Sequence, residues 1–156
     1  MAGSGSLGYD PAISDRFDLE RFVAAQDRSA AYVTALAELA RGVKSSHWMW
    51  FVFPQMAGLG RSATAQFFAI ASLDEARAYL AHPVLGPRLR ECAAVLLRIP
   101  RRPADEIFGT LDAAKLKSSM TLFLRAAPNE SLFAQVLRKY FDDGRDAATD
   151  AALLGL

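Results

Sequence analysis

Cysteine is almost absent from this chain of 156 residues, since Cys92 is its only one. No disulfide can form within the chain, which excludes the small disulfide-stabilised folds and favours a reducing compartment. One cysteine and two histidines also cannot supply the ligands of a structural zinc site, so we expect no metal. We expect Cys92 itself, within RECAAVLL, to be a small buried thiol rather than a nucleophile.

Long apolar runs and an excess of charge of one sign are lacking too. No window approaches the ~18 consecutive apolar residues that cross a membrane, and the first residues lack the basic and apolar regions of a signal peptide. The 18 Lys and Arg residues nearly balance the 17 Asp and Glu residues, and the net charge of +1 creates no large field for nucleic acid or an anionic membrane. The chain therefore predicts a cytoplasmic protein without a membrane partner, and its charge argues against nucleic acid. Its oligomeric state is not readable from the sequence.

The alternating polar and apolar pattern of β-strands is nearly missing as well. Residues 1–16, MAGSGSLGYDPAISDR, are rich in Gly, Ser and Ala, have no hydrophobic periodicity, and predict a flexible N-terminal segment. Residues 17–156 predict a single mainly α domain, a bundle of about six to eight short helices. The one open stretch is 48–53, which is too apolar to reveal its period and is either helical or a minor strand.

Helix boundaries are indicated by residues that can satisfy free backbone groups at helix ends. Asp18, Ser62 and Asp112 each precede a helical pattern and can accept hydrogen bonds from its first N–H groups. The segment SLDE at 72–75 is a capping box, in which the serine and the glutamate bond each other's backbone N–H. Pro83 predicts that the helix before it ends at His82.

The first candidate for a functional site is the stretch KSSHWMWFVFPQ, residues 44–55, which holds both tryptophans. The run from Trp48 to Phe53 is typical of a core, and this explains most of its side chains without any further role. The two indole rings are open to a second interpretation, because either could instead wall a pocket and offer a flat face to a ligand. The lysine, serine and histidine before the run suit anion capture or acid–base chemistry. The candidates here are the ligand contacts Lys44, Ser46, Trp48, Trp50 and Gln55, and the catalytic candidate His47.

The second candidate is DAAKLKSSM, residues 112–120. On a helix, Asp112, Lys115 and Ser119 lie within about 60° of one another and form one polar stripe beside the buried face. Serines in mid-helix compete for backbone hydrogen bonds, so Ser118 and Ser119 serve either tight helix packing or contact with a ligand. All four residues are candidate ligand contacts, although Lys115 and Asp112 could also be only a surface ion pair.

Five arginines gather within fifteen residues, at positions 88, 90, 98, 101 and 102. They could meet a nucleic-acid backbone. Since no aromatic residue is interleaved with them and the whole chain is nearly neutral, we interpret them as a solvated surface.

Several of these segments together resemble the domain-of-unknown-function 1810 family, whose members include proteins labelled calpastatin-like. The resemblance covers about residues 18–154 and rests on LERFVAAQ, KSSHWMWFVFPQMAGLGRS, SLDEARAYLAHPVLGPRLREC, EIFG and DAAKLKSSMTLF. It implies a mainly helical, single-domain bacterial protein without an established biochemical function. The calpastatin-like label implies protease inhibition, but nothing in the chain resembles a disordered inhibitory repeat.

Two functions of different classes follow from the sequence. The first is a pocket for a phosphate-bearing small molecule of nucleotide or ADP-ribose type, in a binding protein or an enzyme that needs no cofactor. The alternative is a non-catalytic protein–protein interaction domain that uses an apolar groove or the arginines. The first requires residues 44–55 and 112–120 to meet around one water-accessible hollow.

Overall fold

The computed structural model describes residues 15–156, so the predicted flexible segment 1–16 lies outside the described residues except for Asp15 and Arg16. The prediction of a mainly α fold is confirmed. In the described range, the residues outside the helices form no strand longer than one isolated bridge. The helical elements, in chain order, are α2 (Glu20–Asp27), the 3₁₀ turn η2 (Arg28–Ala30), α3 (Ala31–Arg41), α4 (Met49–Val52), α5 (Ala63–Phe67), α6 (Leu73–Ala81), α7 (Leu85–Arg98), α8 (Ala104–Phe108), α9 (Thr110–Ala126), α10 (Ser131–Phe141) and α11 (Ala147–Leu153).

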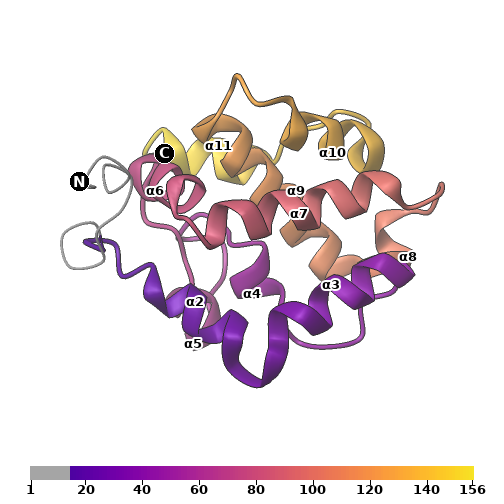
Figure 1. Cartoon of the computed structure of the whole chain (residues 1–156). Helices are drawn as coiled ribbons and strands as arrows, with labels where there is room; N and C mark the ends of the chain where they lie inside the picture. Colours follow the sequence, from indigo (N-terminus) through magenta and orange to yellow (C-terminus); the bar gives the residue numbers. More distant parts are fainter. Residues whose placement is uncertain (1–14) are drawn as a thin grey trace, which may run out of the picture.

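Helix α9 is the centre of the fold and contacts α6, α8, α10 and α11. Figure 1 shows α10 and α11 on one side of the molecule and α2 and α3 on the opposite side, with α9 between them. From Ser118 to Leu124 every residue of α9 is buried, so this half of the helix is covered on all sides. Its first turn, in contrast, is accessible, and Leu111 is 80% exposed. A helix that is buried at one end and open at the other presents its free N-terminal N–H groups at the surface.

The stretch 48–53 contains a helical turn and no strand, which settles the choice that the sequence left open. Met49–Val52 form the single turn α4, and the N–H of Phe53 bonds the carbonyl of Met49 at 3.0 Å. No neighbouring strand is available to pair with this segment in the described structure, and a helical turn satisfies its backbone locally. The nearest approach to a sheet is the parallel bridge between Met56 and Ile70, which closes the loop after α4. The described residues form more helical elements than the predicted six to eight, because single-turn elements such as α4 are counted separately.

The predicted helix boundaries are confirmed where the cap and its donor are close in sequence. The Ser62 hydroxyl accepts the N–H of Ala65 at 3.1 Å, and α6 ends at Ala81, just before His82. The capping box is half correct: the Ser72 hydroxyl accepts the N–H of Glu75 at 3.1 Å, but the glutamate accepts the N–H of Ala71.

Two predicted caps are wrong. The carboxylate of Asp15, and not that of Asp18, accepts the N–H of Leu19 before α2, since Asp18 has a left-handed backbone with φ 54°. Helix α9 begins at Thr110 after Gly109, and Asp112 lies within its first turn. The carboxylate of Asp112 is occupied by lysine side chains rather than by backbone N–H groups.

The core contains the largest apolar side chains of nearly every helix, among them Trp48, Tyr79, Phe123 and Phe133, each under 2% exposed. The ring of Phe123 lies 5.3 Å from that of Tyr79 and 5.9 Å from that of Phe133, so aromatic packing joins α6, α9 and α10. Across residues 15–156, no helix combines the length and the apolar character that crossing a bilayer requires.

Candidate functional site

The loop that carries the first candidate residues is held by one buried carboxylate, Glu38, in the last turn of α3. Glu38 is 3% exposed and accepts hydrogen bonds from the backbone N–H groups of Ser45 at 2.8 Å and Ser46 at 3.0 Å. It also accepts the Ser46 hydroxyl and, at 2.9 Å, the indole N–H of Trp48. A single side chain therefore fixes the path of the backbone from the end of α3 to the start of α4.

These bonds keep Glu38 ionised despite its burial. Burial would raise its pKa, but the hydrogen bonds from Ser46, Ser45 and Trp48 outweigh it and lower the pKa from 4.5 to about 2. A buried carboxylate with four donors is a strong structural anchor, because its charge is delocalised over fixed hydrogen bonds.

The segments 44–55 and 112–120 meet in space. The ammonium of Lys44 lies 2.8 Å from one carboxylate oxygen of Asp112, and the ammonium of Lys115 lies 3.2 Å from the other. The Lys115 ammonium also lies 4.9 Å from the ring centre of Trp50. Asp112 therefore brings Lys44 from a distant part of the chain to the first turn of α9, where Lys115 also lies, and Trp50 lies against the more exposed of the two lysines.

Asp112 is ionised in this arrangement. Burial acts to raise its pKa, but the hydrogen bond and positive charge of Lys44, followed by those of Lys115, outweigh burial and lower the pKa. The Lys44 side chain is only 7% exposed and its ammonium also donates to the carbonyl of Ser46, whereas Lys115 is 28% exposed. Lys115 is thus the cation that a ligand reaches more easily.

Two surface hollows adjoin this contact, and Trp50 and Lys115 line both of them. The first, which we call the lysine hollow, has a volume of about 410 Å³ and is lined by Lys44, His47, Met49, Trp50, Phe108, Gly109, Thr110, Leu111, Asp112 and Lys115. It opens onto the first turn of α9, whose backbone N–H groups have no partner within the helix. Within residues 15–156, the exposed imidazole of His47 has no hydrogen-bonding or ionic partner.

The second, which we call the serine hollow, has a volume of about 470 Å³. Its polar lining comes from Gln55, Arg61, Ser62, Lys115, Ser118 and Asp146, and its apolar lining includes Trp50 and Leu59. Among the described residues, the carboxamide of Gln55 has no hydrogen-bond partner and is available to a ligand.

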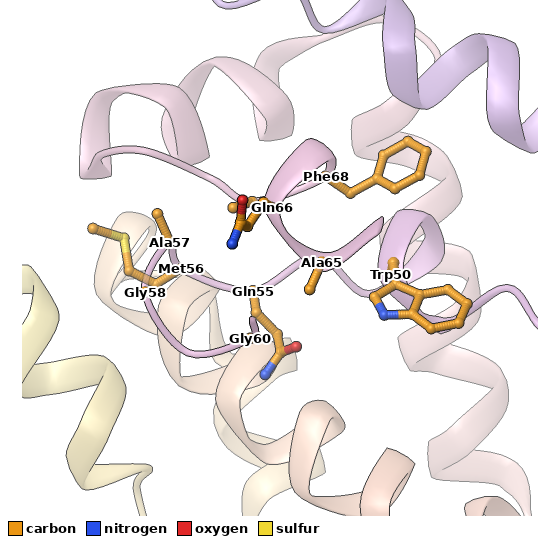
Figure 2. Close-up of a pocket in the computed structure, with 10 residues that line it drawn as sticks. Trp50, Gln55, Met56, Ala57, Gly58, Gly60, Ala65, Gln66 and Phe68 are labelled. Atoms are coloured by element: carbon orange, nitrogen blue, oxygen red, sulfur yellow. The ribbon is translucent and has the colours of Figure 1, made fainter. Parts of the chain in front are cut away.

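A smaller pocket of about 120 Å³, also lined by Gln55, lies between the loop after α4 and α5. Figure 2 shows Trp50 and Phe68 at one end of this pocket and Met56 and Ala57 at the other, with Ala65 between them. A methyl group on Gly60 would come within 2.6 Å of the Ala65 side chain, so only glycine lets the loop approach α5 this closely. Trp50 lines this pocket and both hollows, which makes it the shared wall of the whole region.

Seven of the ten predicted site residues line the two hollows, namely Lys44, His47, Trp50, Gln55, Asp112, Lys115 and Ser118. The other three lie elsewhere. Ser46 and Trp48 point to Glu38, and the indole of Trp48 is 1% exposed. Ser119 is fully buried on the core side of α9, and its hydroxyl has no hydrogen-bond partner among the described residues.

Several residues of the region cannot be identified as site residues from the sequence. Glu38 belongs to the helical pattern of α3, and its only signal is a charged residue beside the buried positions Ala35 and Leu39. Asp146 and the loop residues around Gly60 reach the serine hollow only through the tertiary fold, so no local pattern identifies them.

The remaining chemical groups lie outside this region. Cys92 is buried, as predicted, and burial raises its pKa to about 12, which keeps the thiol protonated and unreactive. Within the described residues, no three His, Cys, Asp or Glu side chains lie close enough together to hold a metal ion. The imidazole Nδ1 of His82 accepts the backbone N–H groups of Val84 and Leu85, so this side chain caps the start of α7.

Comparison with known proteins gives a family but no activity. A family model described as "Protein of unknown function (DUF1810)" matches residues 16–153 of the chain. Among solved structures, the chain is similar to the crystal structure of the conserved hypothetical protein Rv1873 from Mycobacterium tuberculosis, with 49% sequence identity and a TM-score of 0.86. That similarity covers 91% of this chain and 99% of the other. No protein with a curated description matches the chain.

Proposed function

Since this chain belongs to the DUF1810 family of proteins of unknown function, we propose from its site that it binds a phosphate-bearing small molecule of nucleotide or ADP-ribose type. The observation that carries the proposal is the convergence of Lys44, Lys115 and Trp50 beside the open first turn of α9. Cations and an aromatic face are the two kinds of group that such a ligand needs.

The phosphate groups would bind in the lysine hollow. Lys44 and Lys115 outnumber the single carboxylate of Asp112 there, so the cluster keeps a net positive charge. The free N–H groups at the start of α9 and the helix dipole add to the attraction for an anion. The carboxylate of Asp112 suits a ribose hydroxyl, which would explain an acidic residue within a phosphate site.

The ring of the ligand would bind on the Trp50 side. Stacking on an indole is worth about 1–3 kcal/mol per base, and the unpaired carboxamide of Gln55 offers both a donor and an acceptor to a heterocycle. Ser118 donates its hydroxyl to the carbonyl of Ala114 at 3.2 Å and has acceptor capacity left for the ligand. For any turnover of the bound molecule, we propose His47 as the general acid or base.

Thermal unfolding with added ligands tests this proposal. ADP-ribose and ADP are expected to raise the unfolding temperature in a concentration-dependent way, and adenosine to raise it less, because a ligand that binds only the folded state stabilises it. Lys115→Met should abolish the stabilisation without changing the unfolding temperature of the free protein by more than a few degrees, since its ion pair with Asp112 is partly exposed.

Lys117→Met is the matched control, because Lys117 lies on the same helix and lines neither hollow. It should keep the full response. Equal stabilisation of the Lys115 and Lys117 variants, or no response of the unchanged protein to any phosphate-bearing compound, would count against the proposed site.

A second candidate function is the non-catalytic interaction domain. It is supported by a groove of about 500 Å³ beside α2 that is lined by Phe51, Phe67 and Phe68, with Phe67 58% exposed. In the same thermal assay, stabilisation by short apolar peptides and not by nucleotides would favour this function.

We also propose a bacterial cytoplasmic protein. The similarity to a Mycobacterium tuberculosis protein supports the bacterial origin, and the single buried thiol of Cys92 suits a reducing compartment.

A further inference from the structure

A third hollow lies on a different part of the molecule, where α7 leads into α8. It has a volume of about 600 Å³ and is lined by Ile99, Arg101, Arg102, Pro103, Lys139 and Asp142. We call it the arginine hollow. It shares no lining residue with the lysine and serine hollows, so its chemistry is independent of the function proposed above.

Arg102 is the unusual residue of this hollow. Its Nε atom is buried and has no hydrogen-bond partner among residues 15–156. The Cδ and Nε atoms of Arg102 lie beside Gly42 at the end of α3, 3.7 and 4.0 Å from where a Cβ on that glycine would stand. A guanidinium whose Nε–H is removed from water without an acceptor is unfavourable, and an anion that binds the other N–H groups of the same guanidinium would offset this cost through its charge.

Lys139 contributes a positive charge that is fixed in position. Its ammonium donates to the backbone carbonyls of Leu96 and Leu97, each at 3.0 Å, and to that of Ile99. These bonds use its three donors, so Lys139 acts on a ligand through its charge, while the two arginines keep free N–H groups. The lining therefore holds three cationic side chains and one carboxylate, that of Asp142.

The lining also indicates the size and kind of anion. No aromatic side chain belongs to it, and the protein as a whole has a net charge of only +1, so neither base stacking nor a long-range field favours a nucleic-acid strand. Adjacent guanidinium groups match the oxygen atoms of phosphate in pairs. We propose that the arginine hollow is a second anion site, which binds a compact phosphate-bearing molecule through the guanidinium groups of Arg101 and Arg102.

Calorimetric titration with sodium tripolyphosphate at about 0.15 M salt tests this site, since surface charges separated by more than about 8 Å are largely screened there. The Lys115→Met variant is the background for every titration, so that the lysine hollow does not contribute to the heat. We expect saturable binding that weakens at least tenfold on the further change Arg102→Met, which keeps the aliphatic stem beside Gly42. Arg98→Met is the control, because Arg98 is exposed, lies three residues before Arg101 and does not line the hollow; it should bind tripolyphosphate unchanged.

Three outcomes would overturn the proposal: no saturable binding in the background protein, equal loss in the Arg98 and Arg102 variants, or tighter binding of a duplex oligonucleotide than of tripolyphosphate. The Nε–H resonance of Arg102 in a ¹⁵N-correlated spectrum gives a second readout, assigned by its loss in Arg102→Met. It should shift on addition of tripolyphosphate, and an unmoved resonance at saturation would also contradict the proposal. Because every titration uses the Lys115→Met variant, failure of tripolyphosphate binding at the arginine hollow is distinguishable from failure of the proposed nucleotide site.

Discussion

Glu38→Gln is expected to destabilise the protein by about 3 kcal/mol at pH 7, which corresponds to a fall of roughly 6–12 °C in the unfolding temperature of a domain of this size. The carboxylate accepts four hydrogen bonds from Ser45, Ser46 and Trp48 in a site that is 3% exposed. A carboxamide has one acceptor oxygen and places an NH₂ group against donors that were satisfied, so at least one buried N–H is left without a partner. Thermal and denaturant unfolding followed by circular dichroism measure the loss.

The same residue gives the protein a defined sensitivity to acid. The pKa of Glu38 is about 2 in the folded protein and 4.5 is its ordinary value, so its contribution is complete above about pH 4.5 and is lost as the pH falls toward 2. Over that window the unchanged protein should lose about 3 kcal/mol more stability than the Glu38→Gln variant does. Glu106→Gln is the matched control, because Glu106 is exposed in the first turn of α8. The two variants can be compared directly by their unfolding temperatures and by the pH dependence of their stability. If both quantities are the same for the Glu38 and Glu106 variants, Glu38 is not the anchor of the loop.

Trp50→Ala is expected to weaken binding of an ADP-ribose-type ligand by about 5- to 150-fold, the equivalent of 1–3 kcal/mol of stacking. Trp50 lines the small pocket and both hollows, and its ring is partly exposed, so its removal opens the site from several sides at once. Trp50→Phe keeps an aromatic face and should recover much of the affinity. Dissociation constants from isothermal titration, with circular dichroism of each free variant, measure the effect.

Phe67→Ala is the control for this prediction. Phe67 is a large exposed aromatic residue on α5 that borders the groove beside α2 and lines neither the small pocket nor the two hollows, so its removal should leave ligand binding unchanged. Equal affinities of the Trp50→Ala variant and the unchanged protein would mean that the indole is not part of a ligand site. Loss of binding in both the Trp50→Ala and Phe67→Ala variants would indicate a general effect on the fold instead.

The parts of the fold that can be predicted from sequence are those that depend on near neighbours. The hydroxyl caps at Ser62 and Ser72 each act on an N–H three residues ahead, and the Pro83 break acts on its own neighbour. Asp18 fails as a cap because its own backbone is left-handed, and the nearby Asp15 accepts the N–H of Leu19 instead. Asp112 differs for a reason that is not local, because its carboxylate is held by Lys44 from a remote segment. A short polar residue before a helical pattern therefore predicts a helix start better than it predicts which side chain caps it.

The candidate site can likewise be predicted from the sequence only in part. The polar and aromatic content of 44–55 and 112–120 identifies both walls, and the structure brings Lys44, Trp50, Asp112 and Lys115 together. Sequence alone cannot separate the two tryptophans, because the difference depends on Glu38. That carboxylate accepts the Trp48 indole N–H and draws this ring into the core, while Trp50, two residues later on a helical turn, faces away from it. The sequence also does not separate the arginines by their surroundings. Arg88 and Arg90 form ion pairs with Asp27 and Glu130, whereas Arg102 lines a hollow.

The two indole N–H resonances of the protein test the central claim most directly. The chain has two tryptophans, and they are distinguished by Trp48→Phe and Trp50→Phe. On titration with ADP-ribose in a ¹⁵N-correlated spectrum, we predict a saturable shift of the Trp50 signal and almost none of the Trp48 signal, which is held by Glu38 in the core. A spectrum in which neither indole signal moves at millimolar ADP-ribose, or in which only Trp48 responds, would contradict the assignment of the hollows around Trp50 as a ligand site.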